Sequence, residues 1–395
     1  MSTTNVCEQC GGPLLNGSCT ACDSLLLYRF IHRELLVLAL LSGLAVLVFI
    51  GTRAAAAANR EMRERNASFW YAQAQEALAA GATAAAVTSF QHASTADREN
   101  REYRLGLARA LTQNQQVDAA RQVLLVLRQS QPEDAAVNTQ LARLEVRRSE
   151  LQSALGYYQS AIYGRWSPQQ LTQRRQLRVE LIRFLLANGQ RARALSELLV
   201  LSDELPRDAR IQIEAAHLYQ GAGDARRALN HFLTALEMEP TNAEALAGAG
   251  RTAFELGDYA RAISYFDQLR EPGIEEQLQR NLAADVLLLD PTLPRLTAQQ
   301  RQARLQAGLR YVIRRLETCD AESAGMGSLE PQALAARQLG RTITIEAIRR
   351  SPDLIEAAVE RIAAFVSDLP AKCEPLTIRD RALQHIAARQ AAAVQ

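Results

Sequence analysis

A repeat with a period of about 34 residues constrains the fold of this chain more than any other feature. Glycine recurs at that spacing as Gly189, Gly223 and Gly257. Four further columns keep the same period, and they hold arginine (Arg193, Arg227, Arg261), alanine (Ala194, Ala228, Ala262), a large apolar residue (Leu198, Phe232, Phe266) and proline (Pro206, Pro240). Such a period predicts an array of similar units, each of which buries its apolar face only against its neighbours.

The same frame extends toward the N-terminus. It collects Ala86, Ala120 and Ala154 in the alanine column, Phe90, Leu124 and Tyr158 in the apolar column, and Pro132 in the proline column. Six units result, which start near Ala67, Arg101, Ala135, Arg175, Ala209 and Ala243. Six additional residues, Gln169–Arg174, break the phase after the third unit and predict a loop or a helix extension on one face of the array.

Each column has a physical role in a pair of packed helices. Alanine allows two helices to approach closely, the apolar residue contacts the next pair, and glycine supplies a left-handed turn between the two helices. Ala, Leu, Arg and Gln are the commonest residues and favour helix, whereas strand patterns are almost absent. The sequence therefore predicts an all-α fold.

The pattern resembles the tetratricopeptide repeat (TPR) family over roughly residues 67 to 270. The segments GDARRALNHFLTALEMEP and GDYARAISYFDQL follow the family pattern closely, whereas Arg98 and Trp166 stand where the family usually has proline. The resemblance implies a solenoid of six helical hairpins over residues 67–276, with a concave groove lined by the first helix of each hairpin.

The ninth position of each unit is expected to face that groove. It reads Gln75, Arg109, Arg143, Arg183, His217 and Arg251, and Arg147 lies one turn after Arg143. Because guanidinium groups bind carboxylates in bidentate fashion, these residues predict an acidic protein or peptide partner. The alternative is a solvated helix face, since almost all the positive charge of the chain is arginine and Lys372 is its one lysine.

The repeats carry no sequence motif of an enzyme. P-loop, H-E-x-x-H and G-x-S-x-G sequences are absent, and the five histidines lack the spacing of metal ligands. The net charge is +2, which does not indicate a nucleic-acid partner. We expect a binding protein, without catalysis, nucleic acid or a small-molecule substrate.

A membrane span is predicted between Glu34 and Arg53. The sequence LLVLALLSGLAVLVFIGT carries no charge and would form a helix about 27 Å long, close to the hydrocarbon thickness of a bilayer. We assign residues 33–58 to this helix and its exit from the membrane. A buried soluble helix and a cleaved signal peptide are the alternatives, but the segment that precedes the span is too long and too weakly basic for a signal peptide.

Residues 1–24 contain two CxxC pairs. Cys7, Cys10, Cys19 and Cys22 are spaced to deliver four thiolates to one structural Zn²⁺, and glycines flank both pairs. The segment resembles the short zinc ribbons at the N-termini of many bacterial membrane proteins. Haem attachment needs a histidine directly after a pair, where Gly11 and Asp23 stand, and a redox motif is expected in a thioredoxin-like βαβ unit, which the sequence does not predict. Two disulfides remain an alternative.

Residues 277–395 lose the 34-residue phase but stay helical. We expect four or five helices there, which pack on the last repeat and cap its exposed apolar face. Cys319 and Cys373 lie at the ends of predicted elements and are candidates for a disulfide that would close a 54-residue span. Two unrelated buried cysteines are the alternative.

The clues to membrane orientation disagree. Arg29 and Arg33 precede the span, whereas Arg53, Arg60, Arg63 and Arg65 follow it, which favours cytoplasmic repeats. A thiolate zinc site suits the reducing cytosol, whereas a disulfide forms in an oxidising exterior, so cysteine chemistry favours a cytoplasmic ribbon and extracytoplasmic repeats. We favour this second orientation.

The sequence thus predicts a single-pass protein of the bacterial inner membrane that acts as a scaffold for a protein partner. The first alternative is a regulator whose zinc ribbon binds a cytosolic partner and whose repeats contact an envelope complex. The second is a protein that faces the cytosol entirely. Lipopolysaccharide-assembly regulators that combine an anchor, these repeats and a rubredoxin-like zinc module have that arrangement, although their zinc module lies at the opposite end.

Overall fold

The computed structural model describes residues 6–16, 18–322, 329–369, 373 and 375–394. Eighteen α-helices make up most of this described part, with one two-stranded hairpin near the N-terminus, so the all-α prediction is confirmed. The chain divides into two compact units, Met1–Ser167 and Pro168–Gln395, and each is considered by itself.

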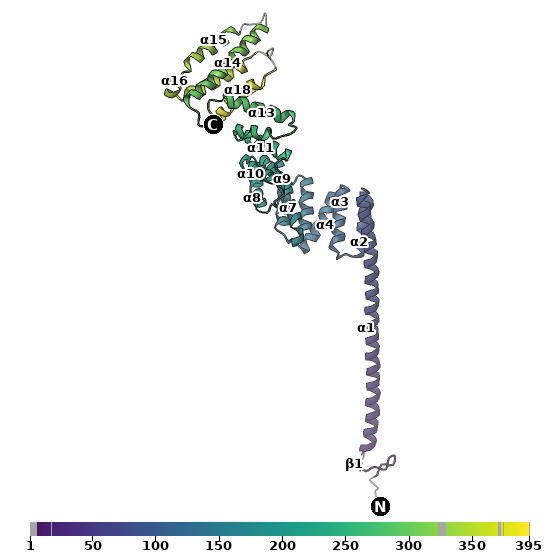
Figure 1. Ribbon diagram of the computed structural model, residues 1–395. Helices are drawn as coiled ribbons and strands as arrows, with labels where there is room; N and C mark the ends of the chain where they lie inside the picture. Colours follow the sequence, from purple (N-terminus) through teal and green to yellow (C-terminus); the bar gives the residue numbers. More distant parts are fainter. Residues whose placement is uncertain (1–5, 17, 323–328, 370–372, 374, 395) are drawn as a thin grey trace, which may run out of the picture. The chain divides into compact units, whose positions relative to one another are not determined.

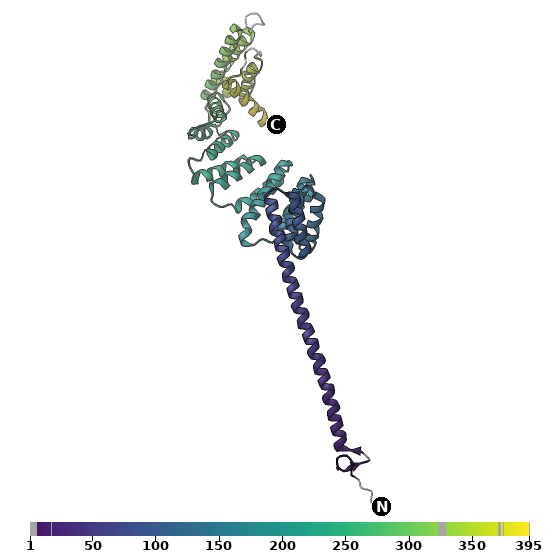
Figure 2. The same ribbon diagram turned by 90° about the vertical axis from the view of Figure 1, so that its right-hand side faces the viewer.

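The first unit contains one very long helix, α1, which runs from Thr20 to Ala79 (Figures 1 and 2). Its 60 residues give it a length of about 90 Å. Every residue from 31 to 66 is exposed. The part Ile31–Ala79 includes a stretch with a mean hydropathy of 2.7, which is long and apolar enough to cross a membrane. Only the last turns of α1, beginning at the buried Ala67, join the folded repeats.

Three helical hairpins complete this unit. The first pairs the end of α1 with α2 (Thr83–Ala96), the second pairs α3 (Arg101–Gln113) with α4 (Val117–Ser130), and the third pairs α5 (Ala135–Arg147) with α6 (Leu151–Ile162). The alanine column and the apolar column are both fully buried between these helices (Ala86, Ala120, Ala154, Phe90, Leu124, Tyr158). The ring of Phe90 packs so closely on Gly106 of the next hairpin that a Cβ atom there would overlap it.

The second unit continues with three more hairpins. They pair α7 (Leu171–Ala187) with α8 (Arg191–Asp203), α9 (Ala209–Ala222) with α10 (Ala225–Met238), and α11 (Ala243–Glu255) with α12 (Tyr259–Phe266). The six additional residues form part of a short 3₁₀ turn, η1 (Pro168–Gln170), and the first turn of α7. The insertion therefore extends the first helix of its hairpin at the N-terminal end.

One residue in left-handed conformation separates the two helices of every hairpin. Four of these residues are glycines and two are not, with φ between 61° and 85° in each case (Gly81, Gln115, Ser149, Gly189, Gly223, Gly257). Asx side chains then cap the first helices of four of the hairpins by accepting backbone hydrogen bonds (Asn100, Asp134, Asp208, Asn242). The turns thus fix where the second helices begin, and the caps fix where these four first helices begin.

Six helices follow the last hairpin in the described residues, rather than four or five. They are α13 (Ile274–Leu289), α14 (Ala298–Glu322), α15 (Glu330–Thr342), α16 (Ile345–Arg350), α17 (Asp353–Ser367) and α18 (Ile378–Val394). The additional helix arises because the Thr344 side chain caps a separate short helix, α16, directly after α15. Helix α13 packs on α12 and α18 packs on α13, so the last hairpin is covered.

Buried polar groups hold α18 in place. Asp290 is fully buried, accepts a hydrogen bond from Thr292 at 2.6 Å and pairs with Arg389 of α18. The Tyr259 hydroxyl of α12 lies 3.1 Å from Nε2 of His385, also on α18. These contacts tie the last helix of the chain to the last hairpin, in addition to the apolar core that surrounds Tyr259.

Candidate functional site

The first CxxC pair lies in a tight knuckle at the N-terminus. The Cys7 N–H donates to the carbonyl of Gly12 at 2.8 Å, and the Gly11 N–H donates back to the Cys7 carbonyl at 2.9 Å. Gly11 adopts φ +71°, a conformation that glycine permits without a Cβ penalty. A two-stranded hairpin, β1 (Leu14–Leu15) with β2 (Ser18–Cys19), then carries the chain to the second pair.

The second pair lies at the N-terminus of α1 itself. Cys19 is the cap residue, and its Sγ accepts a hydrogen bond from the N–H of Cys22 at 3.5 Å. The cluster is thus attached directly to the helix that contains the apolar stretch, with no linker between them.

The geometry of the four sulfurs suits a tetrahedral metal ion. The four Sγ atoms all lie within 4.8 Å of one another, with Cys10 and Cys19 at 3.3 Å and Cys7 and Cys22 at 3.9 Å. Four sulfurs at about 2.3 Å from one Zn²⁺ would lie about 3.8 Å apart. None of these four cysteines is bonded to another, so the structure does not contain the alternative of two disulfides here.

Neighbouring backbone and thiol groups shift the pKa values of these cysteines. Backbone N–H groups of Gln9 and Cys10 stabilise the thiolate of Cys7 and lower its pKa to about 7. The neighbouring sulfurs of Cys10 and Cys19 raise the pKa of Cys22 to about 12. Four thiolates at these distances would repel one another, and a divalent ion would supply the compensating charge.

The exposed side of the first helices is named here the first-helix face. In the first unit it is formed by the end of α1, α3 and α5, and it carries Gln75, Arg109, Arg143 and Arg147. The Arg147 guanidinium donates to the Thr112 carbonyl at 3.0 Å. Arg109 has no carboxylate partner among the described residues.

In the second unit the first-helix face consists of α7, α9 and α11. The three predicted groove residues here each pair with a glutamate of a later helix: Arg183 with Glu214 at 2.7 Å, His217 with Glu244 at 3.1 Å, and Arg251 with Glu276 at 3.0 Å. The structure therefore places all six predicted basic groove residues on first helices, but those of the second unit already have acidic partners within the chain. An uncompensated positive stripe is absent from this part of the described structure.

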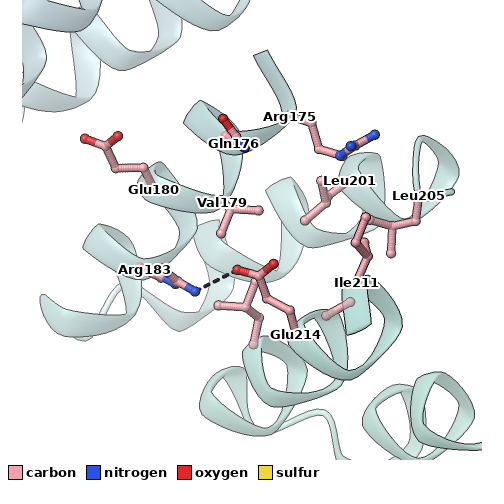
Figure 3. Close-up of a pocket in the computed structure, with 11 residues that line it drawn as sticks. Arg175, Gln176, Val179, Glu180, Arg183, Leu201, Leu205, Ile211 and Glu214 are labelled. Carbon is pink, nitrogen blue, oxygen red and sulfur yellow. Dashed lines mark hydrogen bonds and ion pairs between the residues drawn. The ribbon is translucent and has the colours of Figure 1, made fainter. Parts of the chain in front are cut away.

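A pocket of about 360 Å³ opens between α7, the end of α8 and α9 (Figure 3). Its lining is apolar at the base and charged at the rim, and the Arg183–Glu214 pair crosses it from α7 to α9. Eleven residues line it: Arg175, Gln176, Val179, Glu180, Arg183, Leu201, Leu205, Ile211, Glu214, Ala215 and Leu218. Of these, the sequence predicted only Arg183 as a site residue.

A polar network lies at the contact of the fourth and fifth hairpins. His231 Nδ1 contacts Gln212 Oε1 at 2.7 Å, and Nε2 lies 3.4 Å from the Ser202 hydroxyl. The order Ser–His–Gln resembles a catalytic triad, but a neutral amide replaces the carboxylate that would stabilise an imidazolium. Ser202 is also engaged by Tyr219, which stacks on His231. The network joins two hairpins, as expected for a packing histidine.

Cys319 and Cys373 form a disulfide in the structure, with their Cα atoms 5.6 Å apart. It links α14 to the connection between α17 and α18. Arg315 supports the same connection, since its guanidinium donates to the Cys373 carbonyl at 2.6 Å and lies 3.3 Å from the buried carboxylate of Asp380. Both sulfur-bearing residues are buried.

Sequence reasoning missed the glutamates that neutralise the face. Glu214, the partner of Arg183, occupies the sixth position of the next unit and so faces the same side one hairpin later. The corresponding residue for Arg109 is Gln140, which carries no charge. A search for acids at this offset would have found the Arg183 pair, but not Glu244 or Glu276, which lie at other offsets.

Two models of the tetratricopeptide repeat family match the chain, one over residues 77–144 and the other over residues 213–275. Each match lies within one of the two units. The chain therefore contains tetratricopeptide repeats, as the 34-residue columns predict. No curated protein sequence matches the chain significantly.

Several solved structures of repeat proteins match the chain at low identity. The C-terminal part of a TPR repeat-containing protein from Cytophaga hutchinsonii shares 13% identity, with coverage of 77% of this chain and 97% of that one and a TM-score of 0.41. A tetratricopeptide repeat protein from Parabacteroides merdae shares 13%, with 71% and 99% coverage and a TM-score of 0.38. The TPR2AB domain of yeast Sti1, solved as a complex with pHSP90, shares 16%, with 56% and 94% coverage and a TM-score of 0.24.

Proposed function

We propose that this protein is a membrane-anchored scaffold, which holds a protein partner on its repeats and catalyses no reaction itself. Tetratricopeptide repeats generally mediate contacts between proteins, and the two matched segments lie in both units. The observation that carries the proposal is the single helix α1, because it joins an exposed apolar stretch to the first hairpin without interruption. An apolar helix with no protein around it is stable in a bilayer and not in water.

The anchor is assigned to the apolar stretch between Glu34 and Arg53. None of its side chains is covered by the protein, and its length matches the hydrocarbon core. Arg53 follows it directly and can extend its guanidinium to the lipid headgroups. The exposed residues 54–66 of α1 then separate the membrane from the first hairpin by about 20 Å.

The four N-terminal cysteines would hold one structural Zn²⁺. The segment before α1 has no apolar core of its own, so the metal would supply its folding energy. Cys19 and Cys22 would fix the metal module to the first turn of α1. Zinc bound here would organise the end of the anchor and would take no part in a reaction.

For orientation we favour a cytoplasmic metal module and extracytoplasmic repeats. The buried Cys319–Cys373 disulfide supports this, because such bonds persist in oxidising compartments. The compartment would be the space beyond the bacterial inner membrane. An acidic partner segment would bind near Arg109, which has no carboxylate partner in the described chain.

One observation favours a second candidate, a regulator that faces the cytosol entirely. Arg53, Arg60, Arg63 and Arg65 all lie on the exposed part of α1 directly after the apolar stretch. Positive charge at this place is typical of a cytoplasmic flank. In that case the disulfide would be reduced in the cell.

Membrane orientation can be tested with an introduced cysteine. Gln122 is exposed on the second helix of its hairpin, so a Gln122→Cys variant should react with a membrane-impermeant maleimide in intact spheroplasts. The unmodified protein gives the background labelling of its own cysteines. Labelling only after permeabilisation would establish the cytosolic arrangement instead.

Partner binding can be tested by comparing how often the partner is crosslinked from each of two faces of the repeats. A photo-crosslinking amino acid at Gln75, on the first-helix face, should give protein adducts in cells, whereas the same residue at Gln122 should give few. The Arg109→Glu change should reduce the adducts at position 75, and Arg193→Glu, on an exposed second helix, should not. Equal adducts from both faces would reject a partner-binding groove.

A further inference from the structure

The pocket of Figure 3 is apolar at its base, and an ion pair lies across one of its two ends. The apolar lining comes from α7, α9, the end of α8 and the loop that follows α8 (Val179, Leu201, Leu205, Ile211, Leu218). Leu201 and Leu218 are buried, while Val179 and Ile211 are half-buried and border the opening. A large apolar side chain that entered from outside would therefore displace water from a surface already shaped by the packing of three helices.

The two ends of the pocket differ in charge balance. At one end Arg183 and Glu214 satisfy each other at 2.7 Å. At the other end Arg175 lines the pocket from two turns earlier on α7, and no carboxylate of the described chain pairs with it. Glu180, which lies between the two arginines in the sequence, already interacts with another residue of the chain. The pocket thus offers one guanidinium that a ligand carboxylate can engage.

The spacing sets the length of ligand that fits. Arg175 and Arg183 are separated by two turns of one helix, which corresponds to about 12 Å. An extended peptide advances about 3.3 Å per residue, so three or four residues span the pocket. An apolar side chain at the base and a carboxylate on Arg175 would then come from neighbouring positions of one extended segment.

We propose that this pocket binds a short extended segment of a partner protein, in which a large apolar residue lies one to three positions from an aspartate or glutamate. The inference rests on the proposed scaffold function and specifies the chemistry of one of its contacts. Val179 and Ile211 would contact the apolar side chain, and Arg175 would pair with the carboxylate. The Arg183–Glu214 pair would form the opposite wall of the pocket.

The test selects peptides against the full chain in lipid nanodiscs, with a phage-displayed library of short random peptides as the probe. Enriched peptides should share a Leu, Ile, Met or Phe within three positions of an acidic residue, as specified above. One enriched sequence is then synthesised, and its affinity is measured by fluorescence anisotropy against the unchanged chain and against variants.

Two variants separate the two contacts. Val179→Trp fills the pocket from its opening and should weaken binding by about ten- to a hundredfold, the effect of one lost apolar side-chain burial. Arg175→Glu should weaken binding by about fivefold, and a peptide whose acidic residue is changed to lysine should regain affinity for that variant. Arg193→Glu, an exposed arginine of α8 outside the pocket, is the matched control and should change nothing.

The outcomes distinguish this inference from the scaffold function. Circular dichroism should show unchanged helicity for all three variants. Absence of enrichment, enriched peptides that lack the pattern, or affinities unaffected by Val179→Trp would overturn the pocket inference. The scaffold function fails separately, when photo-crosslinking shows no preference for the first-helix face.

Discussion

At the level of single residues, the turn between the two helices of each hairpin depends on one left-handed position. The sequence period shows glycine there in three units, and the structure adds Gly81, Gln115 and Ser149. The last two were not predictable, because glutamine and serine carry no signature of positive φ. They adopt φ of 61° because the hairpin around them imposes it, at a cost that glycine would not have.

The turn positions give a paired prediction. Gln115→Gly should stabilise the first unit by about 0.5 kcal/mol, since relief of a strain of roughly 1–2 kcal/mol exceeds the entropy lost by glycine. Gly223→Ala, at φ 85°, should destabilise the second unit by about 1 kcal/mol. Urea titrations followed by circular dichroism measure both effects. Destabilisation by Gln115→Gly would show that the glutamine side chain contributes contacts beyond the turn.

Two half-buried histidines should make the free energy of unfolding depend on pH. Burial lowers the pKa of His231, and burial together with Arg389 lowers the pKa of His385. The unfolded chain therefore binds protons near pH 6.5 that the folded chain does not, and stability falls as the pH drops below about 6.5. Urea midpoints at pH 7.5, 6.5 and 5.5 should show this decrease. His231→Gln should reduce it, and an unchanged dependence would mean that His231 does not contribute.

At the level of elements, the folding of the proposed N-terminal metal module is expected to depend on a bound ion. Chelation of zinc, or the double change Cys10→Ser and Cys22→Ser, should expose the amides of residues 6–19 to hydrogen exchange. The repeats from Ala67 onward should keep their protection, because no contact joins them to the cysteine cluster in the described residues. Metal analysis of the purified protein should give close to one zinc per chain, and a value well below one would contradict the assignment.

The disulfide in the second unit gives a stability prediction. The double change Cys319→Ser and Cys373→Ser removes a link across a sequence separation of 54 and should lower the stability of that unit by roughly 3–4 kcal/mol. The unmodified protein should lose a similar amount in a reductant strong enough to open the buried bond. A non-reducing digest analysed by mass spectrometry identifies the linked peptides, and two free thiols there would refute the pairing.

Whether an element was predictable depended on whether its contacts are periodic. The alanine and apolar columns predict the hairpins because every unit repeats the same packing. Helix α16 escaped prediction because its start depends on one local cap, Thr344. The sequence also did not predict the acidic partners on the first-helix face of the second unit, since Glu244 and Glu276 reach their basic partners from positions that do not repeat.

At the level of the whole molecule, the sequence predicts the order of its parts but not the pocket. The apolar stretch, the cysteine spacing and the repeat period are each local in sequence, so each can be recognised alone. The pocket between α7, α8 and α9 combines Val179, Leu201 and Ile211, and it exists because the packed helices leave a space there. Such a space depends on side-chain volumes from three elements, which no spacing rule expresses.

The uninterrupted helix α1 has one further consequence, which concerns azimuth. Each residue turns an α-helix by about 100°. If α1 is anchored as proposed, the direction in which the first hairpin points around the membrane normal is set by the number of residues between the span and the hairpin. One alanine inserted into Ala54–Ala58 should swing the hairpin by about 100° and four by about 40°, while raising it only about 1.5 Å or about 6 Å. Where a partner is also held by a second membrane-bound component, the yield of crosslinks to it should therefore vary with the angle through which the hairpin turns. It should not vary steadily with the number of residues inserted.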